Sequence, residues 1–452
     1  MRTTRIVLCA VAIVALTGAK RRAVELTPHD LVLERSFAVT DKSILIDFRF
    51  EPVLRALIAN SVAPNMMPEQ FFRQMFDTQR PGPGLDASMP HCDDELLDGM
   101  AAMNGFHRRC PTDEAFLATD TYRSEKFDPV ALINRFDMAD ASGATCGEYR
   151  IIFERDTTPV RFVNIIFEAG LRNPHPEQGL AACRPVAQFW AELSAIDSVA
   201  ERHARLEKFF FQGIDGFPPV FHPDNFRDAP HGIRTMQWIP GLAPHFYQFR
   251  VVNECANGAC RLFVKPDVLE NMPSSSFLDA TNTSDRAKRY RAHFLGQVRN
   301  LVIDDVNGFF MTTPPEFLVG ENESGDRIEH AALLTGFSRN LRTPEGSAFW
   351  TQVQNAVHDA GSNLFPEEVI RRATQLNCEG CHSQAFPIGN GLFFPEAQPF
   401  FNHVSRSTFE KGDEGPDSRY AVSLAMRNVF IPNRMRILTD FLKNGTPPAR
   451  SK

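Results

Sequence analysis

The chain has no excess of positive charge, few Tyr and Trp residues, and no long apolar stretch after its first 20 residues. Its 48 Lys and Arg are outnumbered by 55 Asp and Glu, which gives a net charge of −7. This balance argues against a nucleic-acid partner, because phosphate binding needs a basic surface. Five Tyr and three Trp stand against 39 Phe, and we interpret the Phe residues as core material. Beyond residue 20 no stretch is long and apolar enough to span a bilayer, so we expect no stable transmembrane anchor.

Several catalytic motifs are also missing. The sequence contains no nucleophile elbow, no HExxH pair, no phosphate-binding loop and no glycine-rich turn for a dinucleotide. His222, His231 and His245 are scattered without the spacing of metal ligands. The acidic stretch DDELLD (93–98) is not followed by the spaced ligands of a calcium loop, and we interpret it as a solvated acidic loop.

The N-terminus has the layout of a secretory signal peptide. Arg2 and Arg5 precede the apolar run 6–18, and small residues at its end provide a cleavage point. We expect residues 1–19 to be removed and the protein to be exported, either to the periplasm or out of the cell. The alternative is an uncleaved N-terminal anchor, for which the run is short.

Export determines how the cysteines are interpreted. Cys9 lies in the apolar run and two more belong to a motif near the C-terminus, which leaves six. An even number of cysteines in an oxidising compartment predicts disulfides. Cys255 and Cys260 flank Asn257-Gly258, a hairpin turn signal that places the two thiols opposite each other and within disulfide reach. Order along the chain suggests the other two pairs, Cys92 with Cys110 and Cys146 with Cys183.

Residues 23–355 are expected to form one large α+β region with hairpins and helices. Runs rich in β-formers at 148–155 and 160–170 predict one hairpin, and the runs around Asn257-Gly258 predict a second. The stretch 185–214 has the apolar spacing of two helices.

Charged residues stand beside apolar runs in this region. They are Arg135 and Asp137 in one stretch, and Glu148 and Arg150 in another. Buried charges are normally paired, so these residues are either ion pairs that stabilise the fold or part of a functional site.

After Asn363 the character of the sequence changes. The stretch 366–376 begins with Pro366 followed by two acids, as the first turn of a helix prefers. A second helix is predicted over 432–444, with Gly445 as its stop. We expect residues 364–445 to form a small, mostly α-helical domain with long loops, following the large α+β region.

The second predicted domain contains the pattern CxxCH, formed by Cys378, Cys381 and His382. Residues i, i+3 and i+4 share one face of a helix. Two thiols at this spacing can bond the vinyl groups of one porphyrin, and the adjacent imidazole can reach its iron. A disulfide, a zinc site and a decayed remnant of a haem site are the alternatives, although no second CxxC or HxxxH lies nearby.

With this motif after a leading helix, a loop-rich middle and a closing helix, residues 364–445 resemble a monohaem cytochrome c domain. The resemblance implies one covalently attached haem c, thioether links at Cys378 and Cys381, and His382 as the proximal iron ligand. It covers less than a quarter of the chain. The N-terminal region loosely resembles uncharacterised secreted bacterial proteins in the stretches NRFD (134–137) and CGEYR (146–150), a likeness that implies no activity.

A cytochrome of this kind usually takes its sixth ligand from the loops after the motif. His403 and Met426 are the two candidates, and Met435 lies on the apolar side of the last helix and is expected in the core. An open sixth position is the third possibility. Methionine ligation raises the reduction potential, whereas two histidines usually give a lower one.

The sequence therefore predicts an exported c-type cytochrome that transfers single electrons through its C-terminal domain. Its partner would be a redox protein or a small electron donor or acceptor. One alternative is an oxidoreductase with its active site in the N-terminal region and the haem as electron relay. The other is a haem-based redox or gas sensor. If the protein is an enzyme, we expect a haem-dependent oxidoreductase, and a single CxxCH argues against a dihaem peroxidase.

Overall fold

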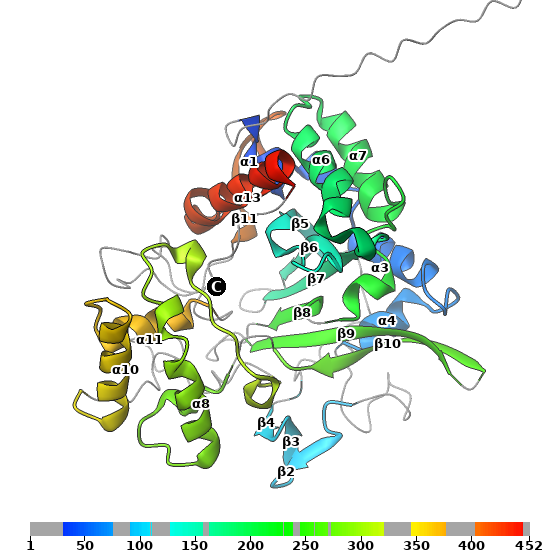
Figure 1. Ribbon diagram of the computed structural model, residues 1–452. Helices are drawn as coiled ribbons and strands as arrows, with labels where there is room; N and C mark the ends of the chain where they lie inside the picture. Colours follow the sequence, from blue (N-terminus) through cyan, green and yellow to red (C-terminus); the bar gives the residue numbers. More distant parts are fainter. Residues whose placement is uncertain are drawn as a thin grey trace, which may run out of the picture.

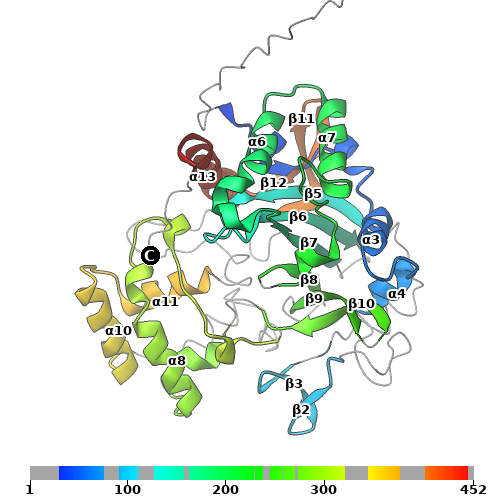
Figure 2. The same cartoon turned by 45° about the vertical axis from the view of Figure 1, so that its right-hand side comes forward.

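A seven-stranded antiparallel sheet organises the molecule, with helices on both sides of it (Figures 1 and 2). The computed structural model describes residues 30–75, 91–108, 110, 127–156, 162–228, 230–237, 245–256, 258–269, 273–320, 345–376 and 403–445. The strand order is β1-β5-β6-β7-β8-β9-β10. The strands are β1 (Ala38–Val39), β5 (Asp128–Arg135), β6 (Thr145–Asp156), β7 (Phe162–Arg172), β8 (Gly232–Gln237), β9 (His245–Ala256) and β10 (Ala259–Asp267).

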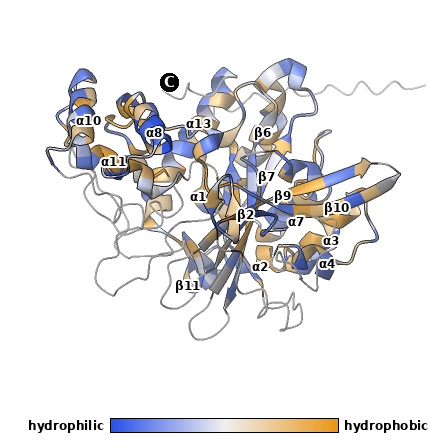
Figure 3. Ribbon diagram, turned by 90° about the horizontal axis from the view of Figure 1, so that it is seen from below, coloured by the Kyte–Doolittle hydropathy of each residue, from blue (hydrophilic) through white to orange (hydrophobic). Residues whose placement is uncertain are grey.

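Both predicted hairpins are present. β6 pairs with β7, and β9 pairs with β10 in a register that sets Cys255 opposite Cys260. Gly258 has φ of 79°, which the two-residue turn requires. The far end of the β9–β10 hairpin extends beyond the body of the molecule (Figures 1 and 3). All three predicted disulfides are confirmed: Cys92–Cys110, Cys146–Cys183 and Cys255–Cys260.

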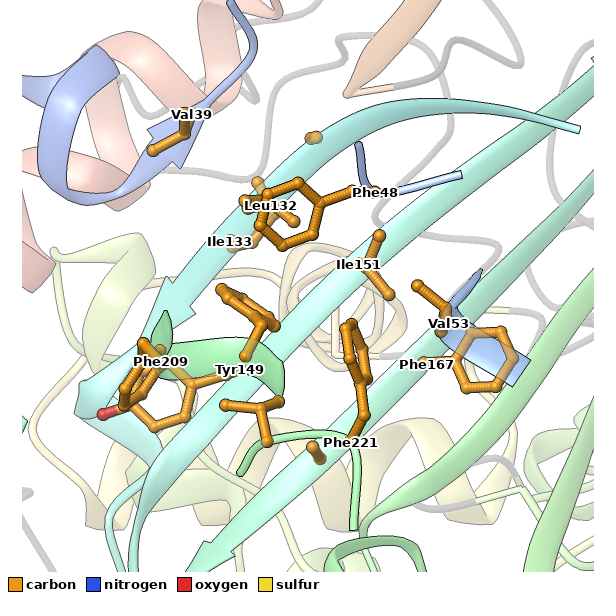
Figure 4. Packing of buried hydrophobic residues seen from close by; sticks show 14 of the residues in the cluster. Val39, Phe48, Val53, Leu132, Ile133, Tyr149, Ile151, Phe167, Phe209 and Phe221 are labelled. Atoms are coloured by element: carbon orange, nitrogen blue, oxygen red, sulfur yellow. The ribbon is translucent and has the colours of Figure 1, made fainter. Parts of the chain in front are cut away.

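One face of the sheet, called here the helix-covered face, carries alternate aromatic and aliphatic side chains. It packs against α3 (Phe50–Ala59), α6 (Arg184–Leu193) and α7 (Val199–Phe211). Tyr149 of β6 stacks on Trp190 of α6, with 5.5 Å between ring centroids, and Phe209 of α7 meets Tyr149 edge-on at 5.0 Å. Figure 4 shows Tyr149 and Phe209 close together among the buried side chains over the sheet. The many Phe residues of the sequence are used largely in this core, where an aromatic ring buries a large apolar area.

A second apolar cluster, called here the helical unit, lies on the other side of the sheet (Figures 1 and 2). It is built from α8 (Asp285–Leu295), α10 (Ala348–Asp359) and α11 (Pro366–Thr374). Ser284 and Ser347 cap α8 and α10, and each hydroxyl accepts a backbone N–H of the first turn. Buried side chains of the three helices, among them Tyr290, Val353 and Ile370, form its core.

The last described segment returns to the sheet. β11 (Val404–Gly412) and β12 (Gly415–Val422) form a hairpin, followed by a π-helical turn, η10 (Met426–Phe430), and by α13 (Ile431–Asn444). Thr40 binds Tyr420 through both its backbone and its hydroxyl, at 3.1 and 2.8 Å. Phe441 of α13 packs on Phe136, with 4.8 Å between ring centroids.

The expected fold class is therefore wrong. We predicted a large α+β region followed by a small, mostly α-helical cytochrome c-like domain. The structure is a sheet-rich body, and its C-terminal end holds a β-hairpin and one regular α-helix, α13. The two helices predicted around the motif do exist, as α11 and α13, and Gly445 ends α13 with φ of 75°. They belong to different apolar clusters, however, because α11 packs in the helical unit and α13 packs on the sheet.

The remaining elements are short. They are α1 (Leu33–Ser36), α2 (Lys42–Leu45), α4 (Pro68–Arg73) and a three-stranded sheet of β2 (Glu95–Leu97), β3 (Met100–Met103) and β4 (Phe106–His107). Residues 95–97, predicted as part of a solvated loop, form an exposed strand instead. In the described part of the chain, no helix combines the length and apolarity that crossing a bilayer requires. Residues 1–19, predicted as a signal peptide, lie outside the described residues.

Candidate haem site and a buried charge network

The CxxCH residues Cys378, Cys381 and His382 lie outside the described residues, but the helix that leads to them is well anchored. α11 buries Val369, Ile370 and Ala373 in the helical unit. Arg372 of the same helix is fully buried, and its Nη1 donates to the backbone oxygens of Leu301 and Ile303, at 2.9 and 2.8 Å. The motif thus begins two residues after Leu376, at the end of a helix held by packing and by charge-assisted hydrogen bonds.

Gln375, three residues before Cys378, has an unusual environment. Its side chain is buried, with 7% of the residue exposed, and among the described residues neither its Oε1 nor its Nε2 has a hydrogen-bond partner. A buried amide without partners costs free energy, because it has given up its bonds to water. This residue stands three positions before Cys378, the first cysteine of the motif.

His403 is one candidate for the sixth iron ligand, and Ser423 holds it in two ways. The Nδ1 of His403 lies 2.9 Å from Oγ of Ser423, and the backbone N–H of Ser423 donates to the carbonyl of His403 at 2.8 Å. The ring also meets Phe430 edge-on, at 6.3 Å between centroids. Ligand histidines characteristically bond through their second ring nitrogen to a nearby acceptor, which fixes the tautomer and the direction of the ring. The contact between His403 and Ser423 takes this form in the tautomer that carries its proton on Nδ1.

Met426, the other candidate, is oriented differently. Its side chain is buried in the core of the sheet body, with 6% of the residue exposed. Its Sδ lies 3.9 Å from Nη2 of Arg434 on α13, which donates to the sulfur. Its backbone N–H donates to Oγ of Ser423 at 3.2 Å, so both candidates meet at this serine. The Met426 sulfur therefore lies against Arg434 inside the core, whereas the His403 ring contacts Ser423. Met435, expected in the core, is half-buried and packs against it.

The three scattered histidines of the N-terminal region do not come together. His222 caps the short 3-10 turn that begins at Pro223, His231 bonds to Glu148, and His245 begins β9. Among the described residues there is no group of three or more His, Cys, Asp or Glu side chains that could hold a metal ion.

A network of charged side chains crosses the face of the sheet opposite the helix-covered face. Glu148 and Arg150 of β6 pair with each other, and Arg150 also reaches Glu168 of β7, at 3.1 Å. Arg234 of β8 binds the other oxygen of Glu168 at 3.2 Å. The carboxylate groups of Glu148 and Glu168 are 1% and 0% exposed, so these are buried ion pairs, as one of our two readings of Glu148 and Arg150 proposed.

Arg135 and Asp137, the other pair noted in the sequence, extend this network. Arg135 binds Asp137 at 2.9 Å, and Arg434 of α13 approaches Asp137 at 3.8 Å. Arg434 is also the donor to Met426. Arg135 stands opposite Glu148 in the register of β5 and β6, so the two groups of charges adjoin on the sheet.

His231 is fixed in this network by its fit to the sheet. Its Nδ1 lies 3.0 Å from Oε2 of Glu148, and because an ionised carboxylate only accepts, the ring N–H donates. Gly170 stands opposite Glu148 in the register of β6 and β7. A Cβ at Gly170 would lie 2.1 Å from Cδ2 of His231, so the ring occupies the space that any larger residue would need.

These contacts perturb the ionisation of the pair. Burial alone would raise the pKa of Glu148, but Arg150 and the hydrogen bond from His231 hold the pKa well below its usual range. Burial works against the charge of Arg150 as well, yet Glu148 and Glu168 raise its pKa above the usual value. Both groups stay charged at neutral pH.

The comparisons with known proteins can now be stated. No family model, curated protein or solved structure matches this chain.

Sequence reasoning missed Glu168, Arg234, Gln375 and Ser423. For Glu168 a signal was present, because a lone carboxylate interrupts the apolar run 160–170 at a position that alternates with the core residues. Gln375 and Ser423 carried no signal, since their importance depends on burial and on a contact across 20 positions.

Proposed function

We propose that this protein is an exported c-type haem protein that transfers single electrons. Cys378 and Cys381 would attach the haem, His382 would be the proximal iron ligand, and His403 the distal one. The observation that carries the proposal is the CxxCH pattern, a specific signature of covalent haem attachment. The bound haem would supply one reversibly exchanged electron, at a potential set by its two axial ligands and their surroundings.

The residues of the motif and the helix that precedes it suit a haem at this position. The donor set of two thiols and an imidazole suits covalent haem c, and α11 supplies a firm attachment for it. Gln375, buried at the end of α11, places the motif directly beside the core of the helical unit. Ser423 holds His403 through Nδ1, which directs Nε2 as the coordinating atom.

A location outside the cytosol is consistent with a covalently attached haem. Three disulfides are expected of a protein outside the cytosol, where thiols are not kept reduced. The N-terminal pattern of a signal peptide points the same way. We therefore propose the periplasm or the extracellular medium as its location.

The chain's own residues would have definite tasks in electron transfer. His382 and His403 would both hold the iron and so exclude small molecules from it. Ser423 would keep the His403 proton on Nδ1, so that electron transfer requires no change of tautomer. Because histidine at both positions gives a lower potential than a methionine ligand, we expect a comparatively low reduction potential.

The test is the absorption spectrum of the exported protein, oxidised and reduced, before and after denaturation. We expect a c-type spectrum and haem that stays on the denatured chain, and we expect Cys378→Ala/Cys381→Ala to lose it. His403→Ala should convert the iron to high spin, whereas the matched variant Met426→Ala should stay low-spin. A wild-type protein without a Soret band would refute the proposal. High-spin iron in the wild type would instead favour the haem enzyme or gas sensor.

A further inference from the structure

The sheet β2–β3–β4 forms a small structure of its own, separate from the seven-stranded sheet. Figures 1 and 2 show the β2–β3 hairpin at the lower end of the molecule, pointing away from the body. Leu97 pairs with Met100 across a turn made by Asp98 and Gly99, both of which have positive φ, at 51° and 79°. This Asp-Gly turn is the tight type that suits a two-residue hairpin.

The tip of this hairpin is apolar and exposed. Leu96 is 60% exposed, Leu97 37% and Met100 56%. Leu97 and Met100 lie side by side on one face, and Leu96 points to the other, because successive strand residues alternate. Nine large apolar residues are exposed in the described part of the chain, and three of them lie within these five positions. Leu97 and Met100 form an exposed apolar pair on one face of the tip, and Leu96 adds an apolar side chain on the other face. Clustered exposed apolar side chains favour an interaction site more than single ones do.

Acidic side chains surround the tip. The stretch 92–107 contains four acids and no Lys or Arg. The side chain of Asp98 at the turn is 81% exposed, and that of Asp94 at the base of β2 is 40% exposed. Arg286 lies at the other end of this sheet, where it donates to the Asn104 carbonyl at 2.9 Å. The negative charge next to the apolar side chains is therefore that of Asp98, at the turn between Leu97 and Met100.

The hairpin is also held in place before any partner arrives. The Cys92–Cys110 disulfide closes its base, and the carboxylate of Glu95 accepts the backbone N–H groups of Asn104 and Gly105, at 3.0 and 2.8 Å. Asn104 in turn donates through Nδ2 to the backbone oxygens of Pro315 and Leu318, at 2.7 and 2.8 Å. A segment that is already ordered loses little entropy on binding.

We infer that the β2–β3 hairpin is a docking element for a protein partner that has an apolar cleft flanked by lysine or arginine side chains. Charge complementarity selects this occupant. A second copy of the chain would bring two acidic hairpins together in a symmetric contact, and both copies carry a net charge of −7. An anionic membrane surface would repel the same acids. The small apolar tip fits a transient complex, because stable interfaces bury about 1,200–2,000 Å².

This inference does not depend on the haem. An electron carrier needs a transient contact with its partner, so the hairpin would serve the proposed function, but binding through it can be measured on the protein with or without a prosthetic group. A protein without haem could still bind a partner through the hairpin, and a haem protein could fail to do so, so the two proposals are tested separately.

The experiment uses the full exported chain and a labelled synthetic peptide of alternating lysine and leucine. We expect binding that weakens with salt, and hydrogen-exchange protection of the backbone at 95–103. Leu97→Ser/Met100→Ser should weaken binding about tenfold or more, as central contacts of small interfaces do. Asp98→Asn should reduce the salt dependence, and asparagine tolerates the positive φ at this position.

The matched control is Ile46→Ser, which removes an isolated apolar side chain that is 52% exposed. It should leave peptide binding unchanged. The inference is overturned if the peptide does not bind, if protection appears elsewhere, or if Ile46→Ser weakens binding as much as the hairpin variant. It is equally overturned if light scattering shows a dimer that Leu97→Ser/Met100→Ser dissociates, or if anionic vesicles bind the wild type through the hairpin.

Discussion

Replacing Gly170 by alanine tests the buried charge network most directly. The backbone of Gly170 has no positive φ, so alanine is allowed there and the effect is purely steric. Its Cβ would lie 2.1 Å from Cδ2 and 2.4 Å from Nε2 of His231, far inside contact distance. The ring cannot move without giving up its 3.0 Å hydrogen bond to Glu148.

The magnitude follows from these two losses. Forcing an extra methyl group into a packed site costs about 1–3 kcal/mol. Weakening a buried hydrogen bond to a charged group adds about 1.5–3 kcal/mol. Because the ring can relieve part of the overlap by breaking the bond, the losses do not add fully, and we expect Gly170→Ala to lower the free energy of unfolding by about 3 kcal/mol.

The assay is urea denaturation followed by tryptophan fluorescence, since Trp190 lies in the same core. Gly296→Ala is the matched control: its backbone is α-helical with φ of −65°, and its Cβ would meet only the His293 carbonyl, at an ordinary 3.4 Å. It should change stability by less than about 0.5 kcal/mol. In a His231→Ala background, Gly170→Ala should cost less than about 1 kcal/mol, because the obstructing ring is gone. Equal costs with and without the ring would refute the reasoning.

Three further predictions concern charge, covalent links and chain division. The pKa of Glu148 is depressed in the folded protein, so its carboxylate stabilises the fold fully at pH values above the unfolded pKa of about 4.3. This stabilisation decreases as the pH falls from that value toward the lower pKa of the folded state. The difference in urea midpoint between wild type and Glu148→Gln should therefore shrink steadily as the pH is lowered below about 4.3. Removing Cys146–Cys183, with a sequence separation of 37, should cost about 4 kcal/mol, and removing Cys255–Cys260, with a separation of 5, about 2 kcal/mol; the opposite order in denaturation experiments would contradict the chain-entropy argument. A fragment of residues 364–445 expressed alone should lack cooperative unfolding by circular dichroism, since its helices pack in different clusters, and a cooperative transition would show that it folds independently.

Features that depend on neighbouring residues could be predicted from the sequence. Pro366 followed by two acids marked the start of α11, and Gly445 marked the end of α13. The Asn257-Gly258 turn determined the register of β9 and β10, and with it the Cys255–Cys260 pair. In each case one or two residues determine where the element starts, ends or turns, because their residue type favours one backbone conformation.

Features that depend on tertiary register could not be predicted. The charges of Glu148 and Arg150 were visible, but their partners on β7 and β8 were not, because a one-residue shift in strand pairing would have turned Glu168 to the helix-covered face. The contact between His403 and Ser423 depends likewise on the pairing of β11 with β12, a hairpin that we had expected to be loop. Its strands are half-exposed and rich in charged residues, so they lack the apolar run of a buried strand.

The error in fold class has the same origin, and it changes how the candidate haem site is understood. Helical periodicity shows which side of α11 and of α13 is apolar, but not which core each side will join. α11 buries Val369 and Ile370 in the helical unit, whereas α13 buries Leu438 and Phe441 on the sheet body. The chain between Leu376 and His403 therefore connects two separate cores. If haem is attached at Cys378 and Cys381 and coordinated by His403, iron coordination would join the helical unit to the sheet body. Replacing His403 would then change the absorption spectrum. It would also make the two cores unfold less cooperatively with each other.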